Sequence, residues 1–308
     1  MITAVTFNAA IDKTYVINCF RKNEVNRAGK VILEPGGKGN NVAKVLKVLG
    51  IPVTASGFAG GINGQWIEML LEEKEIQHDF IRIAGESRMC ISIIEDESTQ
   101  EQTELLEKGP HVTEGDWLKW MGKLSGYAAK SRYVVFSGSL PEGLSSDAYK
   151  ESIKIVNEAG SKAVLDSSGL ALIKGIEGVP HFIKPNRHEF LALIQKEEFV
   201  MSDFISFADD LHTKGTEYVC VTLGKEGAVL SHFGKIFAAA PPSIKAINAV
   251  GSGDAFFAGM LAGLYRKKDP AEALNLAIAS SAANALQLAA GSVSIKEITE
   301  QLKKIQET

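Results

Sequence analysis

The feature that most constrains the fold of this 308-residue chain is the alternation of short apolar runs with amphipathic segments. Segments such as 40–49 place apolar residues at i, i+3, i+4 and i+7, and segments 147–159 and 203–214 each end at a glycine, as helices often do. This alternation predicts an α/β fold with a mainly parallel sheet covered by helices on both faces. The apolar runs that predict its buried strands are 2–7, 53–57, 132–136, 163–166, 182–184 and 217–223.

Two stretches, residues 13–34 and 88–106, break this rhythm. They contain strand-like runs with alternating polar and apolar residues and no helical segment between them. We therefore predict a small separate β-sheet that forms a lid over the substrate and excludes water. The α/β core domain would then consist of residues 1–12, 35–87 and 107–308. A hairpin without a role in closure is the alternative.

Composition and charge exclude several classes of protein. A net charge of −4 and an isoelectric point near 5.9 disfavour a broad nucleic-acid surface. Cys19, Cys90 and Cys220 are widely spaced and odd in number, which favours reduced thiols. No secretory signal is visible at the N-terminus, and segment 271–290 contains too many polar residues for a membrane span. We expect a cytoplasmic protein without membrane or nucleic-acid partners.

A glycine-rich turn at residues 248–253 directly precedes an apolar helical run. Gly251 and Gly253 allow a phosphate to approach the backbone closely, and the free N–H groups of a helix start, at Ser252 and beyond, stabilise negative charge. Asp254 falls in the first helical turn, where the helix dipole favours the ionised carboxylate, so it could accept a proton from an alcohol. The alternative is that Asp254 only caps the helix.

A second glycine-rich turn, at residues 34–41, also leads into a helix and contains Lys38. It matches neither the phosphate-binding GxxxxGK[ST] pattern nor the dinucleotide-binding GxGxxG pattern, which disfavours an NAD-linked protein. A simple glycine-rich turn is the alternative here. Turns without a further role are likewise the alternatives for the strand-end segments 137–143 and 222–228.

Taken together, three motifs resemble the ribokinase-like PfkB family of carbohydrate kinases over essentially the whole chain. They are GGKGNN at 36–41, Asn186-x-x-Glu189, and NAVGSGDAF at 248–256. The N-terminal segments 7–17, 25–31 and 34–46 are most similar to its 1-phosphofructokinase and tagatose-6-phosphate kinase branches. The resemblance implies a three-layer ribokinase-like fold and ATP-dependent phosphorylation of a ketohexose phosphate.

Fructose 1-phosphate, converted to fructose 1,6-bisphosphate, is the first acceptor that this resemblance implies. Tagatose 6-phosphate, converted to tagatose 1,6-bisphosphate, is the second, and an unphosphorylated sugar or a nucleoside is the third. The sequence leaves the oligomeric state open, with a homodimer among the options.

The resemblance also implies roles for individual residues. Asp254 would be the general base, next to Gly251, Ser252 and Gly253. The sugar pocket would consist of Asp12, Gly36, Gly37, Lys38 and Asn41, with Ser139 from the loop after residue 136. Because a sugar phosphate requires cations, we assign Arg88, Lys38 and Arg27 to its phosphate group.

On the nucleotide side, the resemblance implies ATP and Mg²⁺. The predicted ATP-binding residues are Lys184, Asn186, Thr222, Gly224, Gly227, Asn248, Val250 and Asn284, the last beside the adenine. Asn186 and Glu189 would act on Mg²⁺ directly or through water, because Mg²⁺ keeps several waters and needs few protein ligands. A zinc site is disfavoured, since His188-Glu189 lacks the second histidine of HExxH.

Two positions depart from the family pattern. Ala9 replaces a proline that usually follows the asparagine, and residues 103–110 read TELLEKGP where relatives commonly have TEINEPGP. Leu106 therefore replaces an asparagine in the predicted lid, and this change bears on lid contacts and on sugar preference.

Overall fold

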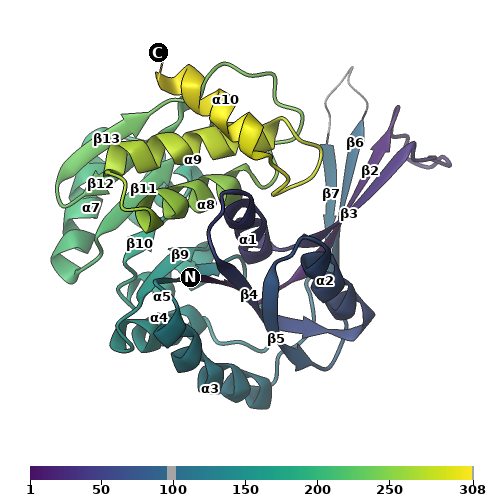
Figure 1. The fold of residues 1–308 in the computed structure, drawn as a ribbon, viewed down its shortest axis with the longest axis horizontal. Coiled ribbons are helices and arrows are strands. Elements are labelled where there is room, and N and C mark those ends of the chain that lie inside the picture. The colour runs from purple at the N-terminus through teal and green to yellow at the C-terminus, as the bar shows by residue number, and fades with distance from the viewer. Residues whose placement is uncertain (96–101, 307–308) are drawn as a thin grey trace.

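Nine strands form the large sheet of the protein in the computed structural model, which describes residues 1–95 and 102–306 (Figure 1). Their order is β13-β12-β11-β10-β9-β8-β1-β4-β5. Neighbouring strands from β11 to β5 are parallel, whereas β12 pairs antiparallel with both β11 and β13. The strands are β1 (Ile2–Thr6), β4 (Val53–Gly60), β5 (Gln77–Ile83), β8 (Tyr133–Ser137), β9 (Lys162–Asp166), β10 (Phe182–Ile183), β11 (Tyr218–Thr222), β12 (Ala228–His232) and β13 (Lys235–Ala239).

All six strands predicted from the apolar runs are present, as β1, β4, β8, β9, β10 and β11. The structure adds β5, β12 and β13. Strands β5 and β13 lie at the two edges of the sheet, where exposed residues interrupt the apolar pattern, and the apolar run of β12 is only three residues long.

Helices cover both faces of this sheet (Figure 1). The three predicted segments correspond to α1, α4 and α7, and segment 271–290 contains the buried helix α9. The helices are α1 (Lys38–Val48), α2 (Gly61–Glu73), α3 (Glu114–Lys130), α4 (Ala148–Glu158), α5 (Gly169–Ile176), α6 (Arg187–Ile194), α7 (Met201–Lys214), the 3-10 helix η1 (Gly224–Glu226), α8 (Ser252–Tyr265), α9 (Pro270–Ala285) and α10 (Ile295–Gln306). No helix in the described part of the chain is long and apolar enough to cross a membrane.

Two apolar cores lie on opposite faces of the sheet, because successive strand residues point to opposite sides. Ala4 packs in one core with residues of α1, α8 and α9, while the adjacent Val5 packs in the other with residues of α3, α4 and α7. Val164 and Leu165 of β9 divide between the same two cores. This arrangement confirms the predicted three-layer α/β fold.

A second sheet of four strands, in the order β3-β2-β6-β7, extends away from the α/β body next to α2 (Figure 1). It consists of β2 (Ala10–Ile17), β3 (Lys30–Gly36), β6 (Arg88–Glu95) and β7 (Gln102–Leu106), of which only β2 and β6 pair in parallel. The predicted small sheet is therefore present. Residues 96–101 of the predicted lid segment lie outside the described residues, and the action of the sheet as a lid remains a prediction.

Candidate active site

A cavity of about 360 Å³ lies where the small sheet meets the ends of β9 and β11 and the starts of α1 and α8. Its position matches the general rule that ligands of parallel sheets bind at the carboxyl ends of the strands. The predicted functional residues that line it are Asp12, Gly37, Lys38, Asn41, Arg88, Lys184, Asn186, Glu189, Thr222, Asn248, Val250, Gly251, Gly253 and Asp254.

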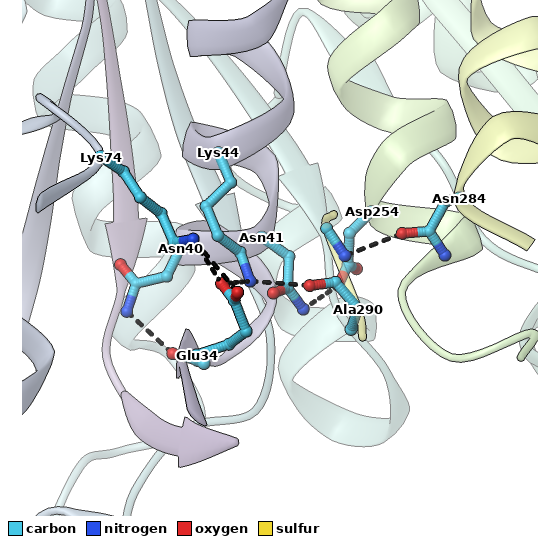
Figure 2. A network of polar contacts seen from close by, with 10 residues as sticks. Glu34, Asn40, Asn41, Lys44, Lys74, Asp254, Asn284 and Ala290 are labelled. Carbon is cyan, nitrogen blue, oxygen red and sulfur yellow. Dashed lines mark hydrogen bonds and ion pairs between the residues drawn. The ribbon is translucent and has the colours of Figure 1, made fainter. Parts of the chain in front are cut away.

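Asp254 lies in the first turn of α8 and is only 5% exposed. The side chain of Asn41 donates a hydrogen bond from Nδ2 to Oδ2 of Asp254 at 2.8 Å (Figure 2). Asn41 belongs to the first glycine-rich segment and Asp254 to the second, 213 residues further along the chain. The two segments therefore meet in space, and the asparagine amide orients the carboxylate.

Burial raises the pKa of Asp254 to about 6. The sequence predicts the opposite direction, because a helix N-terminus stabilises a carboxylate, but removal from water outweighs that effect here. Lys38 lowers the pKa of Asp254, whereas the negative charge of Asp166 raises it. At pH 7 the carboxylate is still mainly ionised, as a general base requires.

The turn before α8 has the geometry of an anion-binding loop. Gly251 has a φ of 78°, and a Cβ atom there would lie 2.7 Å from the Cβ of Ala290, so only glycine fits without strain. No side chain caps the N-terminus of α8, which leaves it to face the cavity. Ser252 is fixed instead, since its Oγ accepts a hydrogen bond from Asn284 at 3.2 Å.

Asp166 is a residue of this site that the sequence analysis missed. It ends β9, is 1% exposed, and forms ion pairs with Lys38 at 3.6 Å and with Lys184 at 3.3 Å. Its charge raises the pKa of Lys38 above the usual value for lysine. An aspartate at the carboxyl end of the apolar run 163–166 is the signal that could have revealed it.

The residues predicted to act on Mg²⁺ cap a helix at the wall of the cavity. Asn186 and Glu189 cap α6 reciprocally: Oδ1 of Asn186 accepts from the Glu189 amide, and Oε2 of Glu189 accepts from the Asn186 amide, both at 2.8 Å. Both residues line the cavity, and neither carboxylate oxygen of the nearby Asp166 accepts a hydrogen bond. Two carboxylates and an amide fit a largely hydrated Mg²⁺ ion.

No group of three or more His, Cys, Asp or Glu side chains among the described residues is arranged to hold a metal ion by itself. Because Mg²⁺ in nucleotide sites takes waters and phosphate oxygens as most of its ligands, a fit to this ion does not require such a group.

The predicted sugar side of the cavity is lined by the small sheet and the start of α1. Asp12 lies on β2, and burial raises its pKa. A Cβ atom at Gly36 would lie 2.1 Å from a carboxylate oxygen of Asp12, so a side chain there would displace that carboxylate. Gly37, with a φ of 90°, forms the turn into α1. Arg88 donates hydrogen bonds to the backbone carbonyls of Asn8 at 3.2 Å and of residue 107 at 3.3 Å.

Three predicted sugar-site residues, Gly36, Ser139 and Arg27, do not line this cavity. Gly36 lies beneath the Asp12 side chain. Ser139 is exposed, and its Oγ accepts a hydrogen bond from Asn8 at 3.3 Å. Arg27 is exposed in the loop between β2 and β3, which lies at the outer end of the small sheet (Figure 1). Within one chain, the structure therefore does not bring Arg27 to the other predicted phosphate-binding residues.

A second hollow, of about 610 Å³, adjoins the first on the other side of Gly253. Asn186, Thr222, Gly224 and Gly227 line it; Thr222 ends β11, and Gly224 and Gly227 belong to the turn between β11 and β12. The segment predicted to bind the nucleotide therefore forms a β-hairpin turn, which was the alternative interpretation of residues 222–228.

Asn284 differs from its predicted place beside the adenine. Its side chain is fully buried, donates to the Val250 carbonyl at 2.8 Å and accepts from the Gly291 amide at 2.7 Å. It therefore supports the turn before α8, and the side chains of α9 that line the second hollow are Ile278 and Ser281. Asn248 has a similar supporting position, since its Oδ1 accepts from the Val250 amide at 2.8 Å.

Comparisons with known proteins show relatives along the whole chain. A tagatose-6-phosphate kinase from Staphylococcus epidermidis is 35% identical over 311 residues, which cover 99% of each chain. Phosphofructokinase-2 from Escherichia coli, solved with substrates and products, shares the fold with a TM-score of 0.91 and 24% identity over 99% of each chain. A Thermotoga maritima protein described as a "possible 1-phosphofructokinase" has a TM-score of 0.87 and 25% identity, covering 98% of this chain and 97% of its own.

The family model that describes the "pfkB family carbohydrate kinase" matches residues 5–297, nearly the whole chain. The protein therefore belongs to the pfkB family of carbohydrate kinases, enzymes that transfer a phosphoryl group to an alcohol.

Proposed function

We propose that this protein transfers the γ-phosphoryl group of ATP to a free primary hydroxyl group of a ketohexose phosphate, with Asp254 as the general base. The first acceptor is fructose 1-phosphate, which would become fructose 1,6-bisphosphate. The observation that supports this best is the contact of Asn41 with Asp254, which sets a buried carboxylate where the predicted sugar side and nucleotide side of the cavity meet.

The acceptor would be oriented by groups of the small sheet and of α1. The Asp12 carboxylate accepts hydrogen bonds from sugar hydroxyls, and Arg88 and Lys38 supply positive charge for the sugar's phosphate group. With the phosphate fixed at one end, the hydroxyl at the other end of the sugar reaches Asp254. The carboxylate takes the hydroxyl proton as the oxygen attacks the γ-phosphorus.

Negative charge on the transferring group would be stabilised by the N-terminus of α8 and by Lys184. Backbone N–H groups at a helix start stabilise such charge most strongly where water is excluded. Asp166, Asn186 and Glu189 would hold Mg²⁺, which, when bound, neutralises charge on the nucleotide phosphates. ADP leaves through the second hollow, beside Gly224 and Gly227.

Tagatose 6-phosphate is the second candidate acceptor, and the 35% identity to tagatose-6-phosphate kinases favours it. Both sugars present a phosphate group at one end and a primary hydroxyl group at the other, so the same residues serve either. Leu106, which lines the cavity from β7, is the residue of this wall that departs from the common family pattern.

An acceptor comparison tests the proposal. ADP release is measured with fructose 1-phosphate, tagatose 6-phosphate, fructose 6-phosphate and unphosphorylated fructose at matched concentrations. We expect fructose 1-phosphate to give the highest kcat/KM. A preference for tagatose 6-phosphate would select the second candidate, and turnover of unphosphorylated fructose alone would refute a sugar-phosphate kinase.

We also propose that two copies of the chain associate through the outer face of the small sheet and that the protein acts in the cytoplasm. Val31, Leu33 and Leu105 lie on the face opposite the cavity and are 48%, 38% and 57% exposed. A twofold axis would bury this face against itself. All three cysteines are unpaired thiols, which supports a reducing compartment that also supplies ATP.

A further inference from the structure

A buried lysine on α1 takes no part in the chemistry described so far. Lys44 is 4% exposed, and its ammonium group donates a hydrogen bond to the Ala290 carbonyl at 2.7 Å and pairs with Glu34 at 3.3 Å (Figure 2). A buried ammonium group is costly unless such partners surround it. The position of the Lys44 ammonium group therefore depends on its contacts with Ala290, near the turn before α8, and with Glu34, on the sugar side of the cavity.

The first contact leads to the anion-binding turn before α8. Ala290 packs so closely on Gly251 that a Cβ atom at Gly251 would lie 2.7 Å from the Cβ of Ala290. A Cβ atom at Gly291 would in turn lie 2.7 Å from Cε of Lys44. The lysine stem, the turn at 290–291 and the turn before α8 are thus in direct contact.

The second contact leads to the sugar side. Glu34 lies on β3 directly across from Asp12 of β2, and it lines the cavity. Glu34 also pairs with Lys74, at the end of α2, at 3.0 Å. Asp12, Glu34 and Lys74 are the charged groups that act on Lys44, and together with it they carry no net charge. One carboxylate therefore connects Lys44 to the small sheet that carries the predicted sugar ligand.

We propose that Lys44 is a positioning residue for phosphoryl transfer: held by Glu34, it fixes the turn at 290–291 against Gly251 and so keeps the start of α8, with Asp254, in its reactive arrangement. This inference rests on the proposed function. Lys44 acts through Ala290 and Gly251 and touches no reacting atom. Because the turn stabilises charge that develops during transfer, displacing it lowers kcat more than it weakens substrate binding.

The chain contains a matched control three residues along the same helix. Lys47 also donates to one backbone carbonyl, that of Glu75 at 2.8 Å, and pairs with one carboxylate, that of the same residue at 3.3 Å. Its side chain is 40% exposed and these contacts are at the surface. Lys47→Met therefore removes the same chemistry without affecting the turn at 290–291.

Steady-state kinetics with ATP and the preferred acceptor test the inference on the purified full-length chain. We expect Lys44→Met to lower kcat by about 10- to 100-fold, the loss that a displaced reactive group causes, with KM for both substrates within about threefold of wild type. Lys47→Met is expected to keep kcat within about twofold. A kcat for Lys44→Met within twofold of wild type would overturn the inference.

A double variant distinguishes the proposed coupling of Glu34 to the 290–291 turn through Lys44 from a general loss of stability. Glu34→Gln combined with Lys44→Met removes both charges together, so it leaves a measurable protein even if the single variant leaves a buried charge that prevents folding. Because Glu34 acts on the turn only by holding Lys44, kcat of the double variant should equal that of Lys44→Met. Glu34→Gln alone should cause a smaller loss of kcat. A wild-type kcat in the double variant would refute this coupling. So would a kcat loss in the double variant that equals the product of the losses in the two single variants. An inactive wild type would instead refute the proposed function.

Discussion

At the scale of single residues, the character of Asp254 follows from a balance between burial and charge. Burial raises its pKa to about 6, while Lys38 and Asn41 favour the ionised form. A general base is most effective when its pKa lies near the working pH, so this balance suits proton transfer from an alcohol near neutrality. The same balance has a consequence for stability.

Replacing Asp254 by asparagine should stabilise the folded protein at alkaline pH. Because the pKa of Asp254 is higher in the folded chain than the value near 3.9 of an unfolded one, the fold loses stability as the pH rises from about 4 to about 6, and the full loss is present above that range. We expect Asp254→Asn to raise the free energy of unfolding by about 3 kcal/mol at pH 8. At pH 4, where the native carboxyl group is protonated, the difference should disappear.

Denaturant unfolding of wild type and Asp254→Asn at the two pH values measures this difference. Equal stabilities at pH 8, or a variant that is less stable there, would show that burial does not dominate the titration of Asp254.

Arg88 should matter for the sugar phosphate and not for ATP. It lines the cavity from the small sheet, on the side away from the second hollow. Removing one charge-assisted contact to a phosphate group is expected to raise KM for the sugar phosphate by about 10- to 100-fold. KM for ATP in Arg88→Ala should stay within about twofold of wild type.

The control for Arg88 is Arg82→Ala, because Arg82 lies on β5, pairs with Glu68 at the surface and does not line the cavity. An unchanged sugar-phosphate KM in Arg88→Ala would favour an acceptor without a phosphate group.

At the scale of secondary-structure elements, the turn into α8 contains two glycines that differ in whether a side chain would fit. Gly251 has a φ of 78° and no room for a side chain, whereas a Cβ atom at Gly253 would meet only the Lys184 ammonium group, at 3.8 Å. Gly251→Ala should therefore destabilise the fold by about 1 to 3 kcal/mol.

Gly253→Ala should instead fold with a wild-type Tm and raise KM for ATP, because its methyl group points toward Lys184 in the cavity. Thermal unfolding and ATP kinetics of the two variants check this pair. A destabilised Gly253→Ala, or a Gly251→Ala as stable as wild type, would contradict the geometry of the turn.

Most strands of the large sheet could be predicted from the sequence, but its edge strands and the contacts of one site residue could not. The apolar runs predicted six strands of the large sheet because those strands are buried on both faces, while β5 and β13 escaped because edge strands expose part of their residues. Asp166 escaped for another reason. Its place at the end of an apolar run marks it as a strand-end aspartate, but its partners Lys38 and Lys184 are distant in sequence, so the local pattern does not reveal that it faces two lysines.

At the scale of the whole molecule, the two sheets divide the cavity wall between them. The small sheet contributes Asp12 and Arg88, and the large sheet with its helices contributes Lys184 and Asp254. The resemblance of the motifs predicted that these parts are functionally related, but residue patterns alone do not place the 36–41 turn against α8. The direction of the Asn284 side chain, too, depends on packing that no motif specifies.

If two copies associate through the outer face of the small sheet, a charge placed in this face should prevent dimerisation. Leu33→Lys introduces a charge into the exposed apolar face and should convert a dimer to a monomer, as measured by light scattering after size-exclusion chromatography. Leu170→Lys, at a still more exposed position on α5, should leave the mass unchanged. A wild-type chain that is monomeric at micromolar concentration would contradict this proposal.

In the proposed mechanism, Asp254 takes the proton of the acceptor hydroxyl where the two glycine-rich segments meet. Turnover of the Asp254→Asn variant with fructose 1-phosphate and ATP, alongside calorimetric binding of ATP, tests it most directly. We expect a folded protein that binds ATP like wild type and loses about 10²- to 10⁴-fold in kcat. A variant that keeps wild-type turnover would contradict it.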